Sequence, residues 1–131
     1  METQFRRYLL GWLANDAELA AGLNAVAEEA PAAAPPPWPA LSASAATDWG
    51  AKGCTGREVR VAFELTCRGD DPATLATLSA ALERRIATLP AAQEGYRVVV
   101  TQFLRSRAQR RAGNRRAMLM EWRFLVLAEP D

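Results

Sequence analysis

Alternation between apolar and polar residues marks the clearest predicted strands of this chain. Residues 58–68 exchange apolar and polar side chains with the two-residue period of a β-strand that has one buried face. The apolar face consists of Val59, Val61, Phe63, Leu65 and Cys67. Residues 116–127 repeat the pattern, and their apolar face consists of Met118, Met120, Trp122, Phe124 and Val126. Such a strand presents one face to a core and the other to water or to a neighbouring subunit.

Two further segments predict strands with less regular patterns. Residues 38–48 alternate small and polar side chains, and the glycine-rich residues 50–56 after them predict a loop. Gly95 opens the other segment. One face of this predicted strand consists of Tyr96, Val98, Val100, Gln102 and Leu104, opposite Val99, Thr101 and Phe103. The chain therefore holds four predicted strands.

Leucines at helical spacing predict a long helix between the second and third strands. Asp71 suits its N-cap and Pro72 its first turn, while Pro90 ends it. The apolar stripe consists of Leu75, Leu78, Leu82, Ile86 and Leu89. At 1.5 Å per residue the helix is roughly 27 Å long, which is enough to cross a small sheet.

The first part of the chain predicts two short helices and a connector. Residues 3–14 form the first helix, whose apolar stripe consists of Phe5, Leu9, Leu10, Trp12 and Leu13. Asp16 suits the N-cap of a second short helical piece. Residues 30–37 predict an extended connector, because their prolines lack a backbone donor and fix φ.

The order of these elements is helix, strand, strand, helix, strand, strand. With 131 residues the chain has the length of one ordinary domain, so we expect a single domain over residues 1–131. Two hairpins under helices predict an α+β fold, with an antiparallel four-stranded sheet of two hairpins and helices packed on one face.

The sequence contains no recognisable set of catalytic residues. The absence of histidine removes the commonest general base and the Ser-His and Cys-His pairs of nucleophilic catalysis. Cys54, close to Lys52, and Cys67 lack the CxxC spacing of zinc sites, and Asp70 and Asp71 are explained as a helix cap. No phosphate loop and no apolar stretch of bilayer length occurs. We therefore expect no enzyme, no catalytic, cofactor-binding or metal-binding residues, and no membrane contact.

A run of arginines between the third and fourth strands is the most unusual feature. Residues 105–116 predict a basic hairpin loop with a turn at Gly113-Asn114. The loop contains no acid, and its cations are Arg105, Arg107, Arg110, Arg111, Arg115 and Arg116. Guanidinium groups this close repel one another unless a partner or salt screens them, so we expect contact with phosphate or with an acidic protein surface. The alternative is a solvated loop.

Charge is divided unevenly along the chain, although the net charge is only +1. Residues 1–50 carry six acids and two arginines, a net of −4, whereas residues 95–131 carry eight arginines and three acids, a net of +5. Copies of such a chain can be complementary to one another. The alternative is that both surfaces are simply solvated.

Several short motifs, taken in order, resemble those of phage tail-completion, or tail-terminator, proteins of prophages and gene transfer agents. Each motif alone has little specificity, but together they cover nearly the whole chain. The matching motifs are Leu9-Leu10, Asn15-Asp16-Ala17-Glu18-Leu19, Pro35-Pro36-Pro37-Trp38, Thr47-Asp48-Trp49 with Lys52, Gly56-Arg57-Glu58, Gly69-Asp70-Asp71 and Phe103-Leu104-Arg105-Ser106-Arg107.

The resemblance implies a structural virion protein that forms a homo-oligomer, a hexameric ring in this family. Such a ring ends the tail tube and joins it to the head, so the implied partners are a tail tube protein and a head–tail connector protein. DNA would pass through the lumen without sequence readout. The implied location is the neck of the virion tail, with the host cytoplasm during assembly. The six arginines would face the tube, the neighbouring subunit or the lumen.

A small nucleic-acid-binding α+β module that uses the arginine-rich loop is the competing interpretation. Such modules stack bases on aromatic side chains exposed on the sheet. The predicted loop has no aromatic residue, and Phe63, Trp122 and Phe124 fall at predicted core positions. The pattern therefore favours the structural virion protein. Another neck protein of the same particle would share its physical features.

Overall fold

The computed structural model describes residues 1–22, 38–68 and 72–129. The predicted connector at residues 30–37 and the Asp71 cap lie outside these residues. The elements in chain order are α1 Glu2–Ala14, α2 Ala17–Gly22, β1 Trp38–Asp48, β2 Gly56–Arg68, α3 Pro72–Ala87, β3 Tyr96–Arg111 and β4 Arg115–Ala128.

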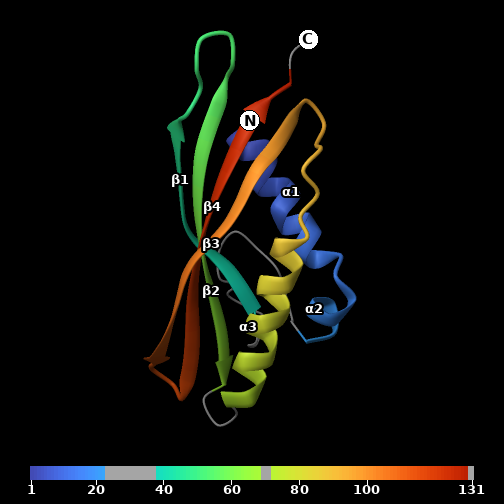
Figure 1. Cartoon of the computed structure of the whole chain (residues 1–131). Helices are drawn as coiled ribbons and strands as arrows, with labels where there is room; N and C mark the ends of the chain where they lie inside the picture. The colour runs from blue at the N-terminus through green and yellow to red at the C-terminus, as the bar shows by residue number, and fades with distance from the viewer. Residues whose placement is uncertain (23–37, 69–71, 130–131) are drawn as a thin grey trace.

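One twisted sheet carries the fold. The hairpins β1–β2 and β3–β4 are both antiparallel, and antiparallel pairing of β2 with β4 joins them in the order β1-β2-β4-β3. The β2–β4 register runs without a shift from Gly56↔Leu127 to Arg68↔Arg115. All three helices lie on the same side of the sheet (Figure 1). The predicted α+β class, with two antiparallel hairpins under helices, is confirmed.

The core lies between the sheet and the helices. The predicted apolar faces of β2 and β4 meet in register, as in Val61↔Trp122 and Phe63↔Met120. The helices contribute Phe5, whose ring packs edge-on against Phe124 at a centroid distance of 4.8 Å. The other large apolar side chains that the helices bury are Leu9, Leu13, Leu19, Leu75, Leu78, Leu82 and Ile86. These residues of the predicted apolar stripes therefore cover the sheet, but α3 ends at Ala87, so the buried Leu89 lies beyond the helix that was predicted to reach Pro90.

Polar contacts fix the ends of the helices. The backbone N–H of Leu19 donates to Asp16 Oδ2 at 3.0 Å, which confirms Asp16 as the N-cap of α2. Trp12 Nε1 donates to the carbonyl of Arg85, and Arg85 Nε donates to the carbonyl of Trp12, both at 2.8 Å. This reciprocal pair ties α1 to α3, because each residue belongs to a different helix.

The predicted basic hairpin loop at residues 105–116 is mostly strand. β3 continues to Arg111 and β4 begins at Arg115, so the connection is only residues 112–114. Gly113 and Asn114 turn the chain with φ of 75° and 54°, the left-handed region that these two residue types tolerate best. The prediction of the loop's extent was wrong because arginine stems fit an exposed edge strand as readily as a loop.

Strict alternation along β3 was also wrong. The register against β4 shifts between Val98 and Val100, and again between Phe103 and Arg105. Each shift inserts an unpaired residue and moves the following side chains to the other face. Tyr96 and Val98, before the first shift, are buried in the core, whereas Val100 and Gln102, after it, lie opposite Leu125 and Arg123 and so no longer share their face. Val99 and Phe103 are 42% and 38% exposed.

Candidate interaction surface

The sheet face opposite the helices, called the helix-free face below, is lined by charged side chains. On this face Glu58 Oε1 accepts a hydrogen bond from Arg60 Nε at 2.8 Å and lies 3.4 Å from Arg123 Nε. The hydrogen bond from Arg60 is the main reason why the pKa of Glu58 lies below its ordinary value, and Arg123 adds to the effect. Two guanidiniums of this face therefore share one carboxylate.

Two of the six predicted contact arginines are neutralised within the sheet. Arg105 Nη2 donates to Glu121 Oε1 at 2.9 Å, and this hydrogen bond raises the pKa of the Arg105 guanidinium. Arg111 forms an ion pair with Glu64 on β2. Both ion pairs join different strands of the same sheet, so these two arginines stabilise the sheet itself.

The remaining four predicted arginines have different surroundings. Arg107, Arg110 and Arg115 are exposed, and none of them forms an ion pair with a described residue. Arg116 is half-buried beside Leu75, where both line a small depression between α3 and the hairpin. Among the residues that the structure describes, the predicted arginines without an ion pair are therefore Arg107, Arg110 and Arg115.

Strand pairing places two of these arginines, Arg110 and Arg115, directly opposite other arginines at the end of the sheet. Arg115 lies opposite Arg111 on one side and opposite Arg68 on the other, and Arg110 lies opposite Arg116. Like charges directly opposite on neighbouring strands are destabilising. Arg68 was missed by the sequence interpretation, because only the pairing of β2 with β4 brings it to the hairpin.

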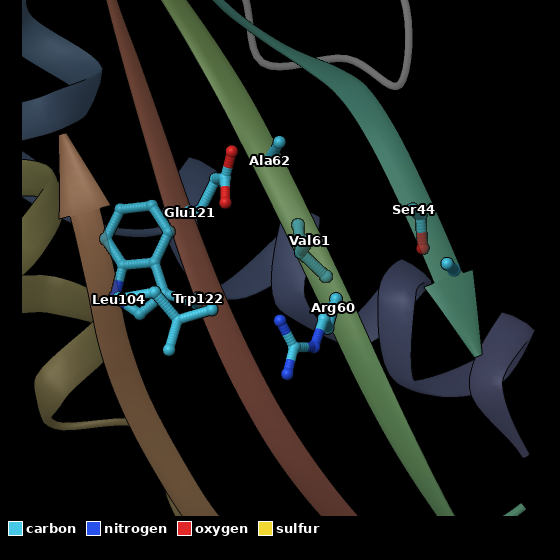
Figure 2. Close-up of a pocket in the computed structure, with 8 residues that line it drawn as sticks. Ser44, Arg60, Val61, Ala62, Leu104, Glu121 and Trp122 are labelled. Atoms are coloured by element: carbon cyan, nitrogen blue, oxygen red, sulfur yellow. The ribbon is translucent and has the colours of Figure 1, made fainter. Parts of the chain in front are cut away.

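A shallow groove of about 230 Å³ crosses the middle of the sheet. Figure 2 shows side chains from all four strands around it, including Ser44, Ala62 and Leu104. Arg60 and Glu121 bound it, and both are already held in ion pairs. The groove offers mostly apolar contact and no converging acid and base.

The described part of the chain contains no candidate metal site, no paired cysteines and no helix suited to span a membrane. Residues 1–22, 38–68 and 72–129 contain no group of three or more cysteine or carboxylate side chains that could hold a metal ion. Cys54 is exposed in a tight turn closed by the Ala51–Cys54 bridge, and Cys67 is buried. Within the same ranges, no helix has the length and apolar character needed to cross a membrane.

A charged sheet face and a basic hairpin end are typical of a protein that contacts other macromolecules. The family comparison makes this class specific. The family model described as "Tail completion protein gp17" matches residues 7–126, so the chain belongs to this family of phage tail-completion proteins. Its role is therefore structural, in the tail of a phage-type particle.

A solved structure shares the fold. The chain is similar to one in the structure titled "Virion of native gene transfer agent (GTA) particle", with a TM-score of 0.75 and 22% identity over 92% of each chain. At this identity the likeness concerns the fold. No curated protein matches the sequence.

Proposed function

We propose that this chain is a tail terminator whose copies form a ring that ends the tail tube and joins it to the head. The observation that carries the proposal is the family match over residues 7–126. The shared fold with a chain of a gene transfer agent virion supports a phage-like particle of that type. A hexamer is the ring size that the family resemblance favours.

The basic end of the sheet is the proposed contact surface of the ring. Arg107, Arg110 and Arg115 are exposed and without an ion pair among the described residues. Opposed guanidiniums at this end lose their mutual repulsion when a partner supplies carboxylates or phosphates. We propose that they contact the tail tube, the head–tail connector or the neighbouring subunit, at the neck of the tail, after assembly in the host cytoplasm.

Nucleic-acid binding remains the competing function. The opposed arginines favour it, because phosphate contacts rest on such charges. Against it, Phe63, Trp122 and Phe124 are buried in the core, so they cannot stack on bases, which leaves the 38% exposed Phe103 as the aromatic side chain beside the arginines. DNA passing through the lumen of the proposed ring needs no such stacking.

Deletion of the gene followed by electron microscopy of the particles tests the proposal. We expect tails of uncontrolled length, or complete tails without heads. Normal particles would remove the structural role. In that case, tight and steeply salt-dependent binding of duplex DNA by the purified chain would establish the competing function.

Replacement of Arg107, Arg110 and Arg115 by serine tests the proposed contact surface. We expect the melting temperature to remain the same or rise, because repulsion is removed and no described ion pair is lost. Particle yield should fall strongly. The matched control is Arg97→Ser, at an exposed position near the other end of β3. Unchanged yield in the triple variant would show that assembly does not use these arginines.

A further inference from the structure

The outer edge of β3 is covered only at its beginning. The backbone N–H of Val98 donates to the carbonyl of Ala91 at 2.8 Å, and the N–H of Gln93 donates to the carbonyl of Tyr96 at 3.0 Å. Residues 91–93 therefore pair with residues 96–98 like a short additional strand. Beyond Val98, no described residue pairs with the outer edge of β3.

The uncovered part of β3 also lies largely at the surface, with Leu75 of α3 beside Ala108 and Arg110 at its far end. No residue of this strand after Val98 is buried, although it continues to Arg111. An edge strand of this length presents a row of unpaired N–H and C=O groups, which is a template for another strand. The edge contains no proline, the residue type that blocks strand addition most directly.

The side chains along this edge select the charge of an incoming strand. After the second register shift, Arg105, Arg107 and Arg111 occupy alternate positions on the helix-free face. Arg107 has no ion pair among the described residues. On the other face, the half-exposed ring of Phe103 lies 5.4 Å from Trp122 and offers an apolar contact. Acidic side chains opposite the arginines would be stabilising, and basic ones would be repelled.

We propose that the edge of β3 from Thr101 to Arg111 binds an extended segment of a partner protein by strand addition. The segment carries an acidic residue opposite Arg107, between Arg105 and Arg111, which keep their ion pairs with Glu121 and Glu64. Backbone hydrogen bonds supply the affinity in this mode, and side chains at alternate positions supply the selectivity. The inference goes beyond the proposed ring, because it names one edge and the chemistry of its occupant.

A second copy of this chain fits the edge less well through its own free edge strand. β1 is the strand at the opposite edge of the sheet, and Ala40–Thr47 contains no charged residue. Asp48 is its single acid. Such a strand leaves Arg107 without an acidic partner, so the charge pattern favours an acidic segment of another protein.

Hydrogen exchange with peptide probes tests the proposal on the purified chain. The first probe alternates glutamate with valine. The second has the same sequence with N-methylated backbone amides, which cannot complete the ladder. We expect the first probe to slow exchange of amides in residues 101–111, and the second to bind at least about tenfold more weakly. Equal binding of both would overturn strand addition, because charge alone would then explain the affinity.

Substitutions locate the site and identify its occupant. Arg107→Glu should lower the affinity for the glutamate–valine probe about tenfold or more, since a charge-assisted contact becomes a repulsion. Arg97→Glu, on the covered part of the same strand, should leave that affinity unchanged. Stronger binding by a peptide of residues 38–48 would overturn the proposal in favour of a second copy. Displacement of the probe by duplex DNA with the same Arg107 dependence would overturn it in favour of nucleic acid.

The two proposals fail separately. Loss of tail-length control on gene deletion tests the terminator function, whatever binds β3. Absence of protection at residues 101–111 rejects the edge site even when the deletion phenotype is as expected.

Discussion

The guanidinium of Arg85 lies over the indole of Trp12, with its carbon 3.3 Å from the ring centroid. The same two residues exchange side-chain-to-backbone hydrogen bonds in both directions. Arg85 is half-buried here, whereas its neighbour Arg84 is 63% exposed in an ion pair with Glu18. One residue position thus separates an arginine that holds two helices together from one on the surface.

Replacement of Trp12 by phenylalanine tests this contact. The smaller ring keeps an aromatic face but loses the Nε1 donor, so we expect the free energy of unfolding to fall by about 1–2 kcal/mol. Urea denaturation measures the change. Arg84→Ala is the control and should cost less than about 1 kcal/mol, because exposed ion pairs contribute little. Equal losses in both variants would contradict the assignment.

Glu58 gives the protein a defined sensitivity to acid. Its pKa is lowered in the folded chain, mainly by the hydrogen bond from Arg60, so the carboxylate stabilises the fold above the unfolded-state pKa. That contribution disappears as the pH falls below the ordinary value of 4.5. Glu58→Gln should therefore flatten the fall of the melting temperature with pH below this value. Glu83→Gln, at an exposed helical position, is the control and should reproduce the original curve.

At the scale of elements, periodicity predicted what depends on burial. The buried faces of β2 and β4 and the buried stripe of α3 contact one core. Every second residue of these strands, and every third or fourth residue of the helix, is therefore apolar, and this pattern can be recognised in the sequence. The two shifts in β3 leave no such mark, because they depend on which residues of β4 lie opposite. The place of Arg68 beside the hairpin arginines could not be predicted for the same reason, since its neighbours belong to a strand distant in sequence.

Glycine-to-alanine substitutions should have opposite signs in two elements. Gly113, with φ of 75°, turns the β3–β4 hairpin, and alanine there should cost about 1 kcal/mol or more. Gly11 lies within α1, and an added Cβ there meets no atom within 4 Å. Gly11→Ala should stabilise the protein by about 0.5–1 kcal/mol. Thermal denaturation of both variants distinguishes them, and equal signs would contradict the turn geometry.

For the whole molecule, two groups of buried side chains act as one core. The smaller group consists of Leu65, Cys67, Leu75 and Leu78, and the larger one surrounds Trp122. Met118 packs against both groups. α3 also links them, because Leu75 and Leu78 belong to one and Leu82 and Ile86 to the other. The sheet and helices should therefore unfold together.

Leu78→Asp tests this coupling. The introduced carboxylate would be buried in the smaller apolar group, which offers it no described partner. The free energy needed to desolvate it exceeds the free energy of unfolding of a protein of ordinary stability. We expect both far-UV circular dichroism and tryptophan fluorescence to report an unfolded chain. Thr77→Asp, on the exposed side of the same helix, should keep a single coincident transition. Loss of helix signal alone would mean that the core is divided.

The central pair of the sheet has a consequence for the time course of folding. β2 is flanked by β1 and β4, and its partner β4 is synthesised only after α3 and β3. The β1–β2 hairpin can close early, but its apolar face and one of its edges stay uncovered until the later elements emerge from the ribosome. Contacts this distant in sequence slow folding and prolong exposure of aggregation-prone surface. Yield of soluble protein should therefore depend on the rate of synthesis and on chaperones more than on final stability.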